Sequence, residues 1–145
     1  MSAAGEGRIP AVLIVDDDDD DRFILQRLLR RSGLVDEIHQ AVDGSAALEL
    51  LASLARQEVT PPEGLPPLLV LLDINMPGMG GLVFLTRFAD LRESLGLEEV
   101  SVVMLTSSSW PRDREASTRF DFVRGYVHKM PETPDELRRV LLELL

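Results

Sequence analysis

Residues 11–21 read AVLIVDDDDDD, an apolar run that is followed at once by six aspartates. The run Ala11–Val15 is short and continuously apolar, which is typical of a strand buried on both faces of a parallel sheet. Asp16 and Asp17 directly follow this strand. Charges at such a position require a compensating cation or another structural reason.

The change between strand and helix periodicity continues along the chain. Four further segments are predicted as strands: Glu37–Ala41, Leu68–Leu72, Val100–Leu105 and Gly125–His128. Five helices are predicted, with approximate limits Asp19–Ser32, Gly44–Gln57, Gly81–Leu95 and Pro111–Phe120 and a last one that begins at Pro134. This alternation with short connections predicts an α/β fold, a doubly wound, five-stranded parallel sheet with five helices covering both faces.

Capping residues mark the starts of two predicted helices, and apolar residues indicate which faces of two helices are buried. Asp43 is an expected N-cap, and Thr133 with Glu136 forms a capping box with Pro134 at the first helical position. The helix that begins at Gly81 is expected to point four residues inward: Leu82, Leu85, Phe88 and Ala89. The last helix is expected to bury an apolar stripe, part of which is also a candidate face for a partner or a homodimer: Leu137, Val140, Leu141 and Leu144.

Length and composition limit the classes of protein to consider. The 145 residues suit one domain, and we expect a flexible segment at residues 1–7 and a folded domain at residues 8–145. Acids exceed bases by 25 to 15, so the net charge of −10 disfavours binding to nucleic acid or to an anionic membrane. The absence of cysteine excludes disulfides and thiolate chemistry. With no apolar stretch long enough to span a membrane and no signal-peptide pattern, a cytoplasmic location is expected.

Side chains that carry chemistry follow the predicted strands. Asp16 and Asp17 follow the first strand, Asp73 the third, Thr106 the fourth and Lys129 the fifth. In open α/β sheets, ligands bind at the carboxyl ends of the strands, so these residues predict a site at one edge. Carboxylate oxygens without histidine or cysteine select a hard cation, with Mg²⁺ expected where phosphate is the second ligand.

The chemistry of this set is that of phosphoryl transfer. An aspartate can act as the nucleophile, and lysine and threonine can hold phosphoryl oxygens. An EF-hand is excluded, because Leu28 and Leu29 stand where the bidentate glutamate would be. The remaining aspartates of the run, Asp18–Asp21, are interpreted as charge at the start of a helix and on the surface.

Four segments carry a resemblance to a known family. They are Val15-Asp16-Asp17, Leu72–Gly81 (LDINMPGMGG), Met104–Ser108 (MLTSS) and Gly125–Lys129 (GYVHK). In this order and at these intervals they resemble the signature segments of receiver domains from two-component response regulators, from about Arg8 to Leu145. The aspartate-rich helix start and the Thr-Ser-Ser-Ser segment followed by Pro-Arg resemble the small stand-alone regulators of phytochrome-type kinases.

The resemblance implies a flavodoxin-like sheet with strand order 2-1-3-4-5 and a role for each matching residue. Asp73 would be the phosphoacceptor and Lys129 would pair with the phosphoryl group. The Mg²⁺ ligands would be Asp16, Asp17, Asp73 and the backbone carbonyl of Asn75. Thr106 and Tyr126 would be the switch residues.

The same resemblance implies a binding and switching module that assists its own phosphorylation and dephosphorylation and is not otherwise an enzyme. Its phosphodonor would be a sensor histidine kinase or a phosphotransfer protein, and its output a surface change that a downstream protein reads. This is a population shift between two packings.

One departure from the family pattern leaves alternatives open. The family places proline directly after the lysine, whereas here Met130 precedes Pro131, which bears on the orientation of Lys129. A receiver that binds partners without phosphorylation is one alternative. The other is a small phosphatase with an aspartate nucleophile, although Asn75 stands where such an enzyme needs a general acid.

Overall fold

The computed structural model describes residues 7–56, 60–73, 81–106, 119–129 and 133–145. Five parallel strands form one sheet in the order β2-β1-β3-β4-β5, which confirms the predicted fold class and strand order. The strands are β1 (Ile9–Val15), β2 (Val35–Ala41), β3 (Leu68–Asp73), β4 (Ser101–Thr106) and β5 (Val123–His128). The helices of the described part are α1 (Asp19–Ser32), α2 (Gly44–Leu54), α3 (Gly81–Arg92) and α5 (Pro134–Leu144).

Two predictions fall largely outside the described residues. The helix expected at Pro111–Phe120 lies almost wholly within residues 107–118, and the described Arg119 and Phe120 belong to a turn, so the described chain has four helices where five were predicted. The division into a flexible segment and a domain at residue 8 also stays a prediction, because the description begins at Gly7.

Three strands begin earlier than predicted, and one of them is β5, which starts at Val123 and not at Gly125. β1 starts at Ile9 and therefore contains Pro10, which has no N–H to donate to a neighbouring strand. Its pairing with β3 begins only at Ala11, so the proline lies at the start of the strand, where it is tolerated. β2 starts at Val35, and only its first and last residues, Val35 and Ala41, are buried, because the strand lies at the edge of the sheet.

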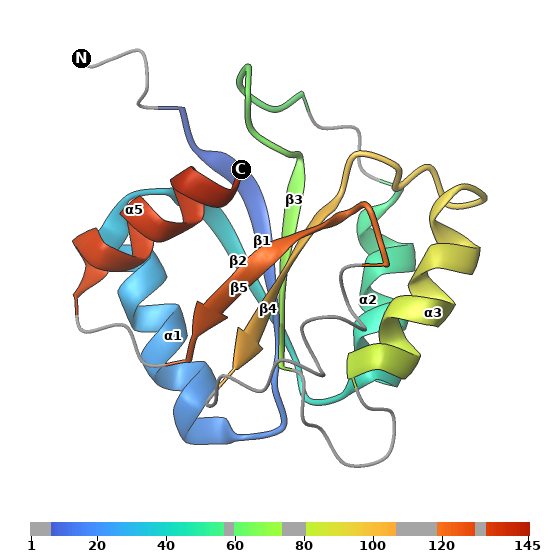
Figure 1. Cartoon of the computed structure of the whole chain (residues 1–145), viewed down its shortest axis with the longest axis horizontal. Helices are drawn as coiled ribbons and strands as arrows, with labels where there is room; N and C mark the ends of the chain where they lie inside the picture. Colours follow the sequence, from blue (N-terminus) through green and yellow to red (C-terminus); the bar gives the residue numbers. More distant parts are fainter. Residues whose placement is uncertain (1–6, 57–59, 74–80, 107–118, 130–132) are drawn as a thin grey trace.

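The helices cover the two faces of the sheet in pairs, α1 with α5 and α2 with α3 (Figure 1). One core forms under α2 and α3, around Phe84, Phe88 and Leu51. The other forms under α1 and α5, around Leu25, Leu29 and Leu137. Every residue of β3 is buried, which is the reason this strand reads as a continuous apolar run that ends in Asp73. None of the helices in these described segments is long and apolar enough to cross a membrane.

The predicted inward face of α3 is wrong at Leu82, which is 36% exposed. The residues that α3 buries are Gly81, Phe84, Leu85 and Phe88, which stand at positions i, i+3, i+4 and i+7 and so form one stripe of the helix. Leu82 stands one position after Gly81 and is therefore rotated by about 100° out of this stripe.

Helix caps hold the segments that lead into the site. The side chain of Asp18 accepts a hydrogen bond from the backbone N–H of Asp21 at 3.0 Å, so Asp18 is the N-cap of α1. Asp43 and Thr133 cap α2 and α5 in the same way, as the sequence predicted. The cap of α1 fixes the first helical turn directly after β1, and this turn carries three more aspartates.

Candidate functional site

The carboxyl ends of β1, β3 and β5 bring three of the predicted site residues to one edge of the sheet. Asp16 directly follows β1, Asp73 is the last residue of β3, and Lys129 directly follows β5. The parallel register, with Val15 opposite Leu72, places the ends of β1 and β3 side by side. The structure therefore brings together side chains that are far apart in the sequence.

Three carboxylates converge at this edge. Oxygen atoms of Asp16, Asp17 and Asp73 all lie within 4.8 Å of one another. Asp16 and Asp73 are buried, with 1% and 4% of their surface exposed, whereas Asp17 is exposed. Negative charges this close in a partly buried position repel one another unless a cation compensates them. An all-oxygen set of this kind suits a hard divalent cation such as Mg²⁺, so the residues present fit the cofactor that the sequence implied.

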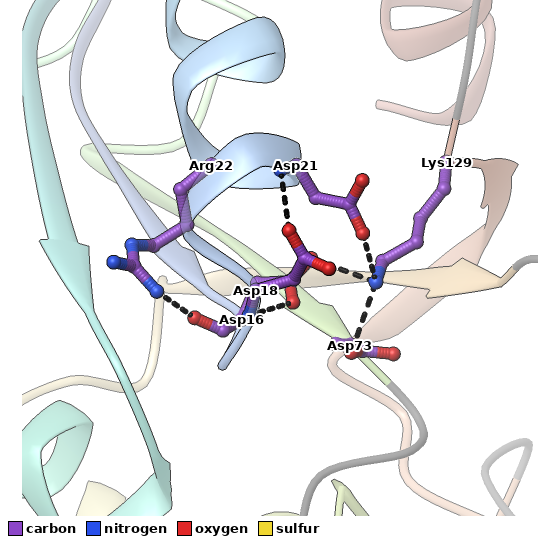
Figure 2. A network of polar contacts seen from close by, with 6 residues as sticks. All are labelled: Asp16, Asp18, Asp21, Arg22, Asp73 and Lys129. Carbon is purple, nitrogen blue, oxygen red and sulfur yellow. Dashed lines mark hydrogen bonds and ion pairs between the residues drawn. The ribbon is translucent and has the colours of Figure 1, made fainter.

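The ammonium group of Lys129 is the positive charge that lies among the carboxylates at this edge. Its Nζ atom lies 2.7 Å from Oδ2 of Asp21, 2.9 Å from Oδ2 of Asp16 and 3.2 Å from Oδ2 of Asp73 (Figure 2). Burial alone would lower the pKa of Lys129, but the hydrogen bonds to Asp21 and Asp16, together with the charge of the third carboxylate, raise the pKa above its ordinary value of 10.5. The lysine is therefore held as an ammonium between strands β1 and β3 and helix α1.

The run of aspartates divides into separate structural roles. Asp18 is the N-cap of α1 and Asp19 pairs with Arg22, while Asp20 is exposed. The prediction that Asp18–Asp21 are only helix-start and surface charge is wrong for Asp21, whose side chain is 19% exposed and directly contacts Lys129. The helical phase explains the difference, because the first turn of α1 directs Asp21 toward the edge of the sheet and leaves Asp20 in solvent.

Arg22 is a second residue that the sequence analysis missed. It is buried at 9% exposure, and its Nη1 atom donates a hydrogen bond of 2.6 Å to the backbone carbonyl of Asp16. Its Nε atom donates to the side chain of Gln40 on β2, and Nη2 pairs with Asp19. The sequence signal was available, because Arg22 lies in the same helical stripe as Leu25 and Leu29. Arg22 thus fixes the backbone that presents the first carboxylate.

The expected switch residues lie on the neighbouring strands β4 and β5. Thr106 ends β4 and is partly buried, and its carbonyl accepts a hydrogen bond of 2.9 Å from the backbone N–H of Lys129. Tyr126, on β5, is partly buried and packs against the core beneath α2 and α3. Asn75 and Met130 lie outside the described residues, so the expected carbonyl ligand and the bond after Lys129 stay predictions.

The chain matches a known protein family over most of its length. Residues 12–141 match the family described as the response regulator receiver domain. The chain belongs to this family. Receiver domains bind Mg²⁺ at an acidic pocket, and in this receiver domain the carboxylates of Asp16, Asp17 and Asp73 cluster at the edge of the sheet.

This receiver domain is similar to several solved response regulators. It is 30% identical to a two-component response regulator from Cytophaga hutchinsonii, with a TM-score of 0.77 over 94% of this chain and 97% of that one. It is 31% identical to the bacteriophytochrome response regulator RtBRR, with a TM-score of 0.70 over 94% and 78% of the two chains. It is 26% identical to the chemotaxis protein CheY4 of Vibrio cholerae, with a TM-score of 0.68 over 94% and 99%.

A curated relative of this receiver domain is a protein-glutamate methylesterase/protein-glutamine glutaminase 1 from Hahella chejuensis. The two are 30% identical over 105 residues, which is 72% of this chain and 24% of the relative. The likeness therefore concerns a receiver portion and does not extend to the rest of that protein. Receiver domains are in general signalling domains that histidine kinases or phosphotransfer proteins phosphorylate, and the fold and family found here fit that role.

Proposed function

We propose that this receiver domain accepts a phosphoryl group on Asp73 and signals through a phosphorylation-dependent change of its surface. The observation that carries the proposal is the position of Asp73, which ends a fully buried strand beside the Lys129 ammonium and the carboxylates of Asp16 and Asp17. A carboxylate in this setting has a fixed position, a cation beside it and candidate ligands for a second cation. These are the features that an aspartate nucleophile for phosphoryl transfer requires.

The transfer itself exchanges one bond to phosphorus for another. A carboxylate oxygen of Asp73 attacks the phosphorus of a phosphohistidine on a kinase or phosphotransfer protein and forms an acyl phosphate. The bond from phosphorus to the imidazole nitrogen breaks, and its electron pair stays on that nitrogen. Asp16, Asp17 and Asp73, with the backbone carbonyl of Asn75, would hold Mg²⁺, which when bound neutralises charge on the phosphoryl oxygens.

The chain's own residues supply the remaining contacts. Lys129, already 3.2 Å from Oδ2 of Asp73, pairs with a phosphoryl oxygen. The hydroxyl of Thr106 donates to another oxygen, and Tyr126 on the neighbouring strand changes its packing in response. Contacts made only in the phosphorylated state bias the protein toward one of two packings, which a downstream protein or a second copy of the chain then distinguishes.

The proposal is tested by mass spectrometry of the intact protein after incubation with a small phosphodonor such as acetyl phosphate. We expect the mass of one phosphoryl group to be added in the presence of Mg²⁺, and no addition in excess EDTA or in Asp73→Asn. Asp90→Asn, which removes an exposed carboxylate on α3, is the matched control and should be labelled like the wild type. Labelling of Asp73→Asn would contradict the proposal.

The same samples separate this proposal from the two alternatives. A small phosphatase with an aspartate nucleophile would hydrolyse many equivalents of a generic phosphate ester for each protein molecule. A receiver that works without phosphorylation would take no label with any donor and would bind its partner equally well as Asp73→Asn.

A further inference from the structure

We propose that Asp21 is a positioning residue for phosphoryl transfer at Asp73, and that it acts by holding the ammonium group of Lys129. The inference rests on the proposed function and adds a residue to it. Asp21 belongs to the first turn of α1, whereas Lys129 follows β5, and 108 sequence positions separate them. The contact therefore ties the start of α1 to the far strand of the sheet across the site.

The Asp21 contact is the shortest of the three that Lys129 makes with carboxylates of the described residues. The distances from Nζ are 2.7 Å to Asp21, 2.9 Å to Asp16 and 3.2 Å to Asp73. Both partners are largely shielded from solvent, with 13% of the Lys129 side chain and 19% of the Asp21 side chain exposed. A hydrogen bond between charged groups is stronger in such a setting than on the open surface.

The backbone holds Asp21 in place independently of Lys129. The N–H of Asp21 donates to the side chain of the N-cap, Asp18, at 3.0 Å. The adjacent Arg22 is buried and bonded to the carbonyl of Asp16. Asp21 therefore extends from a turn that is fixed at both its first residues and its buried face, and its carboxylate is a fixed acceptor (Figure 2).

Whether Asp21 orients the ammonium of Lys129 or competes with Asp73 for it depends on the number of N–H donors that the lysine carries. A lysine ammonium carries three N–H donors, and here three carboxylates surround it, so the bond to Asp21 uses a donor that Asp73 does not need. Asp16 and Asp73 belong to the cluster proposed to hold Mg²⁺, whereas Asp21 lies outside that cluster. Asp21 is thus the partner that remains with Lys129 when the other two carboxylates bind metal and phosphoryl group.

This arrangement also bears on the segment after the lysine. Met130 stands where the family pattern has proline, so the backbone after Lys129 differs in sequence from that pattern. Asp21 constrains the tip of the Lys129 side chain from α1, through a contact between the two side chains themselves.

Asp21→Asn and Asp20→Asn form a matched pair for the test. Both remove one negative charge from the first turn of α1, but of these two described residues it is Asp21 that contacts Lys129. At saturating Mg²⁺, we expect Asp21→Asn to be phosphorylated by acetyl phosphate about tenfold more slowly than Asp20→Asn. Asp21→Glu, which keeps the charge, should recover part of the rate. Because Asp21→Asn loses the shielded contact with Lys129, its urea midpoint should lie below that of Asp20→Asn, and the rates are compared under conditions where both variants are fully folded.

A second readout does not depend on phosphorylation. Without Asp21, the ammonium rests on Asp16 and Asp73 alone and competes there with Mg²⁺. Calorimetric titration with MgCl₂ should therefore give a dissociation constant about threefold higher for Asp21→Asn than for Asp20→Asn.

The outcomes separate the inference from the proposed function. If Asp20→Asn and wild type are labelled and Asp21→Asn is labelled as fast or faster, the positioning role is overturned while the phosphoacceptor role stands. If none of the proteins is labelled in Mg²⁺ with any phosphodonor, the proposed function fails and the positioning role fails with it.

Discussion

The carboxylate of Asp21 lies closer to the ammonium of Lys129 than the carboxylate of Asp73 does, at 2.7 Å against 3.2 Å. One residue comes from the start of a helix and the other follows the last strand of the sheet. The position of the ammonium beside the proposed phosphoacceptor therefore depends on the start of α1 as well as on the ends of β3 and β5.

Lys129 gives a pH dependence with a defined sign. Its pKa is raised above the ordinary 10.5 in the folded protein, so its ion pairs contribute their full stability below pH 10.5 and lose it as the pH rises through the higher value. Without Mg²⁺, the difference in unfolding free energy between wild type and Lys129→Met should be constant just below pH 10.5 and shrink above it. Urea titrations on either side of that pH measure this difference, and a difference that stays constant throughout would contradict the assignment.

Substitution of Asp17 should weaken Mg²⁺ binding without lowering the stability of the protein. Asp17 is the exposed member of the carboxylate cluster, so without Mg²⁺ the substitution Asp17→Asn relieves repulsion and should raise the unfolding free energy, by no more than about 1 kcal/mol. A divalent ion a few ångströms away loses at least about 2 kcal/mol of attraction even at the permittivity of water, so Mg²⁺ should bind at least tenfold more weakly. Calorimetry with MgCl₂ tests this, with Asp20→Asn as the control for the loss of charge; equal affinities would exclude Asp17 as a ligand.

Substitution of Arg22 should lower both the unfolding free energy of the protein and its affinity for Mg²⁺. Arg22→Met removes the buried hydrogen bond to the carbonyl of Asp16 and the one to Gln40, and should lower the unfolding free energy by about 2 kcal/mol. It should also weaken Mg²⁺ binding, because the backbone of Asp16 is no longer held. Arg27→Met, an exposed substitution on the same helix, should change neither quantity. Loss of stability with unchanged Mg²⁺ affinity would confine Arg22 to a structural role.

Much of the fold could be predicted because the strands are buried. β3 is buried along its whole length and β4 nearly so, which produces the apolar runs that were recognised in the sequence. The candidate site followed from the same runs, since Asp73 and Thr106 end these strands and a parallel sheet gathers strand ends at one edge. The starts of the strands were harder to predict, because only the two end residues of the edge strand β2 are buried and β1 includes a proline before its pairing with β3 begins.

The roles of Asp21 and Arg22 could not be predicted in the same way. Six identical residues in a row carry no pattern, so only the helical phase distinguishes Asp21 from Asp20, and that phase depends on which residues α1 buries. The decisive partner, Lys129, lies 108 positions away and is brought near only by the folded sheet. For Leu82 the error had the opposite origin, because an apolar residue beside the buried stripe was counted as part of it.

Locating the phosphoryl group decides whether Asp73 is the phosphoacceptor. The protein is phosphorylated with acetyl phosphate and Mg²⁺, reduced with sodium borohydride, which converts an aspartyl phosphate to homoserine, and sequenced by tandem mass spectrometry. We expect homoserine at position 73 and at no other aspartate, the neighbouring Asp16, Asp17 and Asp21 included. Homoserine at another aspartate, with Asp73 intact, would contradict it.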